Sequence, residues 1–167
     1  MQAILHRDGR LVLGGQIFRA ALGRGGVRGM DKHEGDGATP AGKFPLRRVL
    51  YRADRVAPFD TALPSLPIAR DAGWCDAPGD PAYNTPVTLP YPASTETLWR
   101  EDHLYDVIVV VGHNDNPVVD GAGSAIFLHL APTDGGPTAG CVALKGPELR
   151  ALLARMDRNT MLVVQPR

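Results

Sequence analysis

Glycine and proline interrupt this chain so often that long helices have little room to form. The 167 residues include 19 glycines and 15 prolines, which fall between short runs of β-branched and other apolar residues. Proline removes a backbone donor and glycine costs backbone entropy, so both residue types mark turns and loops more readily than helix interiors. The pattern therefore predicts strands joined by long loops.

The N-terminal segment predicts three consecutive strands. Residues 3–6 and 10–13 are apolar segments on either side of Asp8-Gly9, a dipeptide typical of tight hairpin turns. Residues 16–22 continue the same pattern. We expect the chain to open as a β-meander.

Two strongly apolar segments in the second half predict a pair of strands. They run from Tyr105 to Gly112 and from Ser124 to Leu130, and the first is rich in valine. If they form a hairpin that closes near Gly112 and Ser124, His129 lies opposite about Val107.

Helical periodicity is clear in one segment, about residues 147–156. Pro147 would stand in the first turn, where its missing N–H costs nothing. Apolar side chains recur there at helical spacing, at Leu149, Leu152, Leu153 and Met156. Residues 94–99 predict one or two further helical turns.

The remaining segments complete a mostly β fold. Residues 43–51 and 160–164 predict strands, and the proline-rich stretch 58–92 predicts a long ordered loop region. The expected architecture is a sandwich or barrel-like sheet with one C-terminal helix and long ordered loops. Because no repeat or change of composition divides the chain, we expect a single domain over residues 1–167.

Charge and hydropathy exclude several classes of partner. The chain carries 18 Lys and Arg against 18 Asp and Glu, so its formal net charge is +0, and we expect no nucleic acid or acidic membrane surface as a partner. No apolar run approaches the roughly 20 residues that span a bilayer. No secretory signal is visible at the start, which predicts a cytoplasmic protein, or a periplasmic one if the start is truncated. A monomer or weak homo-oligomer is expected.

A histidine and a cysteine stand in the segment from Ile126 to Leu144. His129 ends an apolar run, and Gly140-Cys141 follows it. A histidine or a cysteine alone is most often part of a core, but an imidazole close to a thiol accepts its proton and makes the sulfur a nucleophile. Cys141 and His129 are therefore the predicted catalytic pair. In a reducing compartment Cys141 and Cys75 are both expected to be free thiols.

Several motifs, in the same order, resemble the L,D-transpeptidase catalytic domain family, also called YkuD-type. These motifs are IFLH at residues 126–129, TAGCV at 138–142 and TPAGKF at 39–44. The segments GWCDAP at 73–78 and GHN at 112–114 resemble a divergent branch of the same family. The resemblance spans roughly residues 31–164 and implies the YkuD-type sheet.

The resemblance implies an acyl-enzyme reaction on peptidoglycan stem peptides. In such a reaction Cys141 attacks the carbonyl of the third stem residue, often meso-diaminopimelate, and His129 passes the proton to the departing D-Ala. Backbone N–H groups near Gly140 would stabilise the oxyanion. A carbonyl near Thr138 is the expected group that orients the imidazole. No cofactor and no metal are expected.

The missing export signal favours one of the family's reactions. Cross-linking takes place outside the membrane, whereas tetrapeptides imported during muropeptide recycling are trimmed in the cytoplasm. The favoured function is a cytoplasmic L,D-carboxypeptidase that binds the diaminopimelate–D-Ala end of a tetrapeptide. The alternatives are an L,D-transpeptidase, a non-enzymatic peptide-binding β-domain, and a zinc enzyme using His113, His129 and Cys141.

Other polar residues are candidates for substrate binding. The hairpin register places Tyr105 and Asp106 beside His129, where Asp106 would orient the imidazole or hold a substrate amine. His113 lies ~20 Å away at ~3.3 Å per residue and is expected to fix its own loop. The remaining candidates lie in charged or proline-rich loops and are Lys32, Asp36, Asp76, Tyr83 and Asn84.

One position departs from the family pattern. The commonest motif has arginine two residues after the cysteine, where this chain has Ala143. The five donors of that guanidinium are therefore absent, and a substrate carboxylate or carbonyl must be bound by another group.

Overall fold

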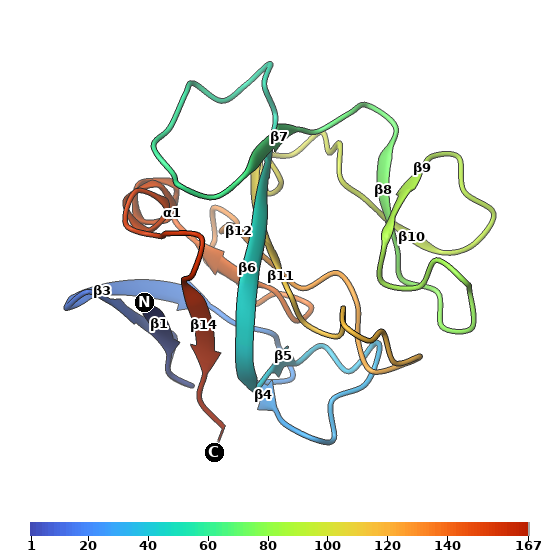
Figure 1. Ribbon diagram of the computed structural model, residues 1–167, viewed down its shortest axis with the longest axis horizontal. Coiled ribbons are helices and arrows are strands. Elements are labelled where there is room, and N and C mark those ends of the chain that lie inside the picture. Colours follow the sequence, from blue (N-terminus) through green and yellow to red (C-terminus); the bar gives the residue numbers. More distant parts are fainter. Residues whose placement is uncertain (167) are drawn as a thin grey trace.

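A closed, barrel-like sheet forms the centre of the structure, a computed structural model that describes residues 1–166 (Figure 1). The strands that close it are β1 Gln2–Leu5, β2 Arg10–Leu13, β3 Gln16–Ala21, β6 Gly42–Tyr51, β11 Val107–Val111, β12 Phe127–Leu130, β13 Val142–Leu144 and β14 Met161–Val164. They follow the order β11-β12-β13-β3-β2-β1-β14-β6, and β6 also pairs with β11. A further strand, β7 (Ser65–Pro67), pairs with β6 in parallel.

The N-terminal meander is confirmed, because β1 pairs antiparallel with β2 and β2 with β3. Gly9 in the turn has φ +81°, the left-handed conformation that glycine adopts without strain. The expected pairing of β11 with β12 is also antiparallel, but Ile108 and not Val107 lies opposite His129. That part of the prediction was wrong by one residue.

Two smaller sheets flank the barrel. The strands β8 (Ala72–Cys75), β9 (Pro86–Thr88) and β10 (Thr95–Thr97) form a sheet in the order β10-β8-β9, at the right of Figure 1. The short strands β4 (Val27–Arg28) and β5 (Thr39–Pro40) pair in parallel.

The strands β7 to β10 correct two predictions. The stretch 58–92 is not only loop, since it contains β7, β8 and β9. The helical turns expected at 94–99 are wrong, since residues 95–97 form β10 and pair with β8. The β-branched Thr95 and Thr97 favour a strand, and the edge of β8 supplies the partner for one.

The single helix among residues 1–166 is α1 (Gly146–Leu153), which is shorter than predicted. Pro147 stands in the first turn, and Leu149, Leu152 and Leu153 are buried. Residues 155 and 156 continue with hydrogen bonds three residues apart, from Arg155 N to Leu152 O and from Met156 N to Leu153 O, so the last turn tightens. No helix within residues 1–166 is both long and apolar enough to cross a membrane.

The strand β11 separates two apolar cores. All five of its residues are buried; Val107, Val109 and Val111 face the barrel interior, whereas Ile108 and Val110 face a second cluster. That second cluster contains Trp74 from the small sheet together with Phe127 and Cys141. The space between the barrel and the small sheet therefore holds the predicted nucleophile.

Candidate active site

A cleft of about 370 Å³ opens between the barrel and the flanking loops. Of the residues singled out in the sequence, those that line it are Cys141, His129, Thr138, Tyr105, Lys32 and Asp76. Those outside its lining are Gly140, Asp106, Asp36, Tyr83 and Asn84. Lining residues that the sequence did not single out include Arg24, Glu34, Glu96, Arg100 and Ala125.

Cys141 is held immediately before β13 by a sharp turn. Gly140 has φ +139°, and a side-chain Cβ at this position would lie 3.0 Å from the carbonyl oxygen of Ala38, so only glycine fits without strain. Thr138 Oγ1 accepts a hydrogen bond from Gly140 N at 3.1 Å and donates to Cys141 O at 2.6 Å. The threonine therefore fixes the turn that carries the cysteine.

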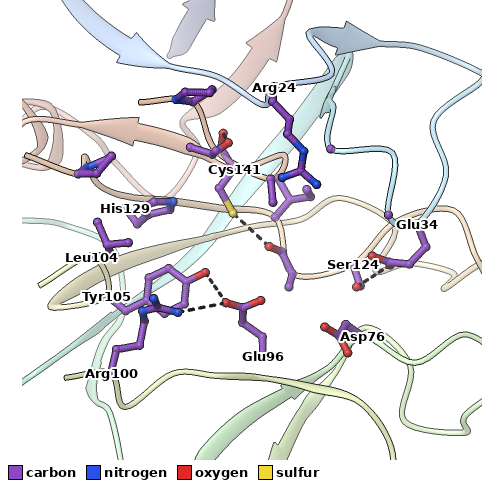
Figure 2. Close-up of a pocket in the computed structure, with 18 of the residues that line it drawn as sticks. Arg24, Glu34, Asp76, Glu96, Arg100, Leu104, Tyr105, Ser124, His129 and Cys141 are labelled. Carbon is purple, nitrogen blue, oxygen red and sulfur yellow. Dashed lines mark hydrogen bonds and ion pairs between the residues drawn. The ribbon is translucent and has the colours of Figure 1, made fainter. Parts of the chain in front are cut away.

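The Cys141 thiol is in its neutral form. It is 9% exposed, and burial raises its pKa to about 12 because the apolar surroundings disfavour the thiolate. The thiol donates to the carbonyl of Ala125 at 3.3 Å, the dashed contact to sulfur in Figure 2, and accepts a hydrogen bond from Phe127 N at 3.4 Å. The acceptor stabilises the thiol, and the N–H stabilises a thiolate once it forms.

His129 is a buried imidazole, and one of its ring nitrogens has no hydrogen-bond partner within residues 1–166. Its Nδ1 lies 2.8 Å from the carbonyl of Leu130, and because a carbonyl only accepts, Nδ1 carries the proton and Nε2 is the basic nitrogen. Burial lowers the pKa of His129 below its usual value, so the ring is neutral at pH 7. The ring of Tyr105 packs edge-on against it, with 5.2 Å between ring centroids.

The group that orients His129 is therefore the Leu130 carbonyl. The sequence pointed to a carbonyl near Thr138 or to Asp106, and both expectations are corrected. Asp106 lies outside the cleft lining, and its carboxylate pairs with Arg55 at 3.2 Å instead.

The imidazole and the thiol lie side by side on one wall of the cleft (Figure 2). His129 lies on β12 and Cys141 immediately precedes β13, and these two strands pair in parallel with His129 opposite Ala143. Within residues 1–166 the thiol hydrogen bonds to Ala125 and Phe127 and not to the imidazole. A proton transfer between them therefore requires the S–H bond to turn away from Ala125.

Asn84 supports this site through a hydrogen bond to Ala125, the residue whose carbonyl contacts Cys141. Its Oδ1 accepts hydrogen bonds from Trp74 Nε1 at 3.0 Å and from Ala125 N at 3.1 Å, and its Nδ2 donates to the carbonyls of His113 and Asn114. Ala125 has φ +50°, an uncommon conformation for a residue with a side chain. Asn84 thus helps to hold the carbonyl that contacts Cys141.

Tyr83 also stabilises the cleft wall. Its hydroxyl donates to Glu34 Oε2 at 2.6 Å and accepts from Gly123 N at 3.0 Å, and Ser124 Oγ donates to the same carboxylate oxygen at 2.7 Å. Burial raises the pKa of Tyr83, so the hydroxyl remains protonated. Tyr83 was predicted to bind substrate, but it lies outside the cleft lining and its hydroxyl makes structural hydrogen bonds instead.

Lys32 and Asp36, two of the charged residues in the loop between β4 and β5, form an ion pair with each other. Lys32 Nζ donates to Asp36 Oδ1 at 2.9 Å, and both side chains are almost completely buried. Asp36 also accepts hydrogen bonds from the backbone N–H groups of His33 and Ala38. Asp36 therefore stabilises its own loop, and Lys32 lines the cleft with its charge already paired.

His113 fixes its own loop, as expected. Its Nε2 lies 3.1 Å from the carbonyl of Ala122, and its ring packs edge-on against Phe44. Among residues 1–166 no group of three or more His, Cys, Asp or Glu side chains is arranged to hold a metal ion. Both Cys75 and Cys141 are free thiols.

A neutral imidazole with a free Nε2, beside a cysteine at the edge of a barrel-like sheet, is the arrangement of a cysteine-dependent acyl-transfer enzyme. The sequence model of the YkuD family, described as the L,D-transpeptidase catalytic domain, matches residues 2–164. The chain belongs to this family, and the resemblance found in the sequence is confirmed. Enzymes of this family use cysteine catalysis on peptidoglycan stem peptides. No curated protein and no solved structure matches the chain.

Proposed function

We propose that the protein is an L,D-carboxypeptidase that removes the terminal D-Ala from tetrapeptide stems. The observation that carries this proposal is the pair of His129, with Nε2 free, and Cys141 on one wall of the cleft of a YkuD domain. The substrate is a tetrapeptide ending in a diamino acid followed by D-Ala.

Acylation begins when the carbonyl carbon of the third residue reaches Cys141. The S–H turns from Ala125 O towards His129, Nε2 takes the proton, and Sγ forms a bond to the carbonyl carbon. The C–N bond then breaks, His129 gives the proton to the departing amine of D-Ala, and a thioester remains on Cys141.

Hydrolysis of the thioester completes the reaction. Water attacks the thioester carbon while His129 Nε2 takes one of its protons. The C–S bond breaks, the tripeptide leaves with a new carboxyl group, and the proton on Nε2 returns to sulfur. The Leu130 carbonyl stabilises the protonated imidazole in both halves, because it accepts from Nδ1–H.

The oxyanion donor in this proposal is the N–H of Cys141. The sequence pointed to N–H groups near Gly140, but Gly140 N–H is already donated to Thr138 Oγ1. The N–H of Cys141 makes no hydrogen bond to residues 1–166 and adjoins the attacking sulfur. One such donor is worth about 3–4 kcal/mol in the transition state.

The size of the cleft supports hydrolysis over transfer. A volume of about 370 Å³ is near the lower end of the range for ligand sites and suits one peptide end with a water molecule. Transpeptidation, the alternative, requires the amine of a second stem at the same thioester. A hydrolase that only trims stems suits the turnover of released fragments, so we place this activity in cytoplasmic muropeptide recycling.

The test is incubation of the purified protein with a disaccharide-tetrapeptide, followed by mass analysis of the products. Tripeptide and free D-Ala are expected, and predominant formation of peptide dimers would contradict hydrolysis. Cys141→Ala should abolish every product, whereas Cys75→Ala, which alters the other buried thiol, is the matched control. Fractionation of cells that produce the tagged full-length protein checks the cytoplasmic location.

A further inference from the structure

Three cationic side chains line the cleft, and two of them already have anionic partners. Lys32 pairs with Asp36 at 2.9 Å, and Arg100 forms two hydrogen bonds with Asp102 at 2.6 and 2.9 Å. The third cation, Arg24, makes no side-chain hydrogen bond and no ion pair within residues 1–166. Its five donors are therefore free to bind a ligand in the cleft.

The position of Arg24 is fixed from two sides. Its backbone N–H donates to the carbonyl of Thr138 at 2.9 Å, which ties it to the turn that carries Cys141. Its side chain lies flat over Gly37, where a Cβ would come within 3.1 Å of Cγ and Nε. Gly37 has φ +67°, so glycine provides both the backbone conformation and the space for the guanidinium.

Arg24 stands apart from the other charged groups that the cleft places near Cys141. Figure 2 shows the Arg24 guanidinium directed into the cleft on one side of Cys141, with the carboxylates of Asp76 and Glu96 on the other side. On that other side Glu96 lies 3.8 Å from Arg100 and accepts a hydrogen bond from the Tyr105 hydroxyl, whereas Asp76 Oδ1 has no hydrogen-bond partner within residues 1–166. A substrate carboxylate is therefore attracted to Arg24, the cation that has no anionic partner. The planar fork of a guanidinium also matches a carboxylate with two parallel hydrogen bonds.

The strand β13 supplies no cation for this purpose. Ala143, two residues after the nucleophile, is fully buried and pairs with Ala21 at the end of β3. Arg24 follows Ala21 by three residues on the segment that continues towards Thr138. The free cation beside the nucleophile therefore comes from the segment that follows the neighbouring strand β3.

We propose that Arg24 is a specificity-determining residue that binds the C-terminal carboxylate of the peptide substrate. This inference rests on the proposed function and specifies how the chain end is recognised. The carboxylate belongs to the residue that leaves, and consecutive Cα atoms are about 3.8 Å apart, so it lies within one residue of the carbonyl that Cys141 attacks. Because Arg24 binds this carboxylate, cleavage is limited to the bond before the last residue of the stem.

The test compares three peptides and four forms of the protein. The peptides are the diaminopimelate tetrapeptide, its C-terminal amide, and an analogue with lysine at the third position, which lacks the side-chain carboxylate. The proteins are the wild type, Arg24→Gln, Arg24→Lys and Arg7→Gln, an exposed arginine in the β1–β2 turn. Since Arg24 is exposed, equal thermal unfolding midpoints are expected for all four.

Arg24→Gln should lower kcat/KM for the tetrapeptide acid by about 10- to 100-fold and leave the amide almost unchanged. The kcat/KM of Arg24→Lys for the acid should lie between the values of the wild type and Arg24→Gln. The kcat/KM of Arg7→Gln should match that of the wild type. If Arg24→Gln lowers kcat/KM equally for the acid and the amide, or does not lower it for the acid, the proposal is overturned. If the lysine analogue shows no loss with Arg24→Gln, Arg24 binds the side-chain carboxylate instead, and the assignment to the chain end is overturned.

A second readout separates this inference from the proposed function. Acylation of Cys141 by a carbapenem, which carries a carboxylate near its reactive carbonyl, is compared with acylation by the methyl ester of the same compound. The acid-to-ester rate ratio should fall about 10-fold or more in Arg24→Gln. If no stem peptide is cleaved while this ratio still depends on Arg24, the proposed function fails and the role of Arg24 stands. If peptides are cleaved and neither readout depends on Arg24, the role of Arg24 fails alone.

Discussion

At the scale of single residues, the site combines an unreactive thiol with a base that is ready to act. Cys141 is protonated and hydrogen bonded to Ala125, whereas His129 presents a free Nε2 to the same cleft. The thiol gains reactivity only when a substrate carbonyl and the imidazole are both in position. This arrangement protects the sulfur from adventitious electrophiles and oxidants, because the thiolate is the reactive form.

The slow reaction of the resting thiol is testable with iodoacetamide. Burial disfavours the thiolate and raises the pKa of Cys141 to about 12, so the reactive fraction is small at neutral pH and rises with pH. At pH 8 we expect alkylation of Cys141 about 1000-fold slower than that of free cysteine, with about a tenfold increase per pH unit. Peptide mapping by mass spectrometry locates the adduct and distinguishes Cys141 from Cys75. A rate that levels off near pH 7 is incompatible with this description of the thiol.

At the scale of elements, the helix α1 is the clearest case of a sequence pattern that determines packing. Leu152 is fully buried among the barrel core residues, and α1 contacts β12 and β3, the first of which carries His129. Leu152→Ala removes this packing and leaves a cavity, so the free energy of unfolding should fall by about 2–5 kcal/mol. Urea unfolding measures the change, with the exposed Arg150→Ala on the same helix as the control. A loss below 1 kcal/mol would indicate that α1 contributes little to the core.

Strong local signals predicted most elements, and tertiary partners determined the rest. The Asp8-Gly9 turn and the apolar β11 are encoded locally, so the sequence was sufficient for them. The strand β10 exists because the edge of β8 is available to it, and no local pattern shows that edge. The same limit explains the register of β11 and β12, where a difference of one residue depends on the whole ring of strands.

The residues of the site also divide into those that a local sequence motif predicted and those that only tertiary contacts bring to the cleft. Cys141 and His129 stand in a motif that is contiguous with two strands, so the sequence placed both beside one cleft. The Leu130 carbonyl had no signal in the sequence, because every residue has a carbonyl. Arg24 was missed because it is more than 100 residues from Cys141 in sequence, and only the pairing of its segment with Thr138 brings it to the cleft. Its place after β3 in a glycine-rich segment was the only available signal.

At the scale of the whole molecule, two buried histidines, His113 and His129, make the free energy of unfolding depend on pH. Burial lowers the pKa of both His129 and His113 below the usual 6.5, so both are neutral in the folded state at pH 7. The unfolded chain binds these protons near pH 6.5, before the folded protein does. The stability that comes from keeping the rings neutral is therefore complete above pH 6.5 and is lost as the pH falls below it.

We expect the free energy of unfolding to decrease between pH 6.5 and 5 by up to about 1.4 kcal/mol per pH unit for each histidine. Urea unfolding at a series of pH values measures the slope. His113→Gln should reduce the slope by up to half and leave Cys141 in place, because His113 does not line the cleft. His33→Gln, at an exposed position, is the matched control for the loss of a histidine side chain. A slope that is the same in His113→Gln and the wild type would show that the protons are taken up elsewhere, since the burial of His113 would then carry no cost for the charged ring.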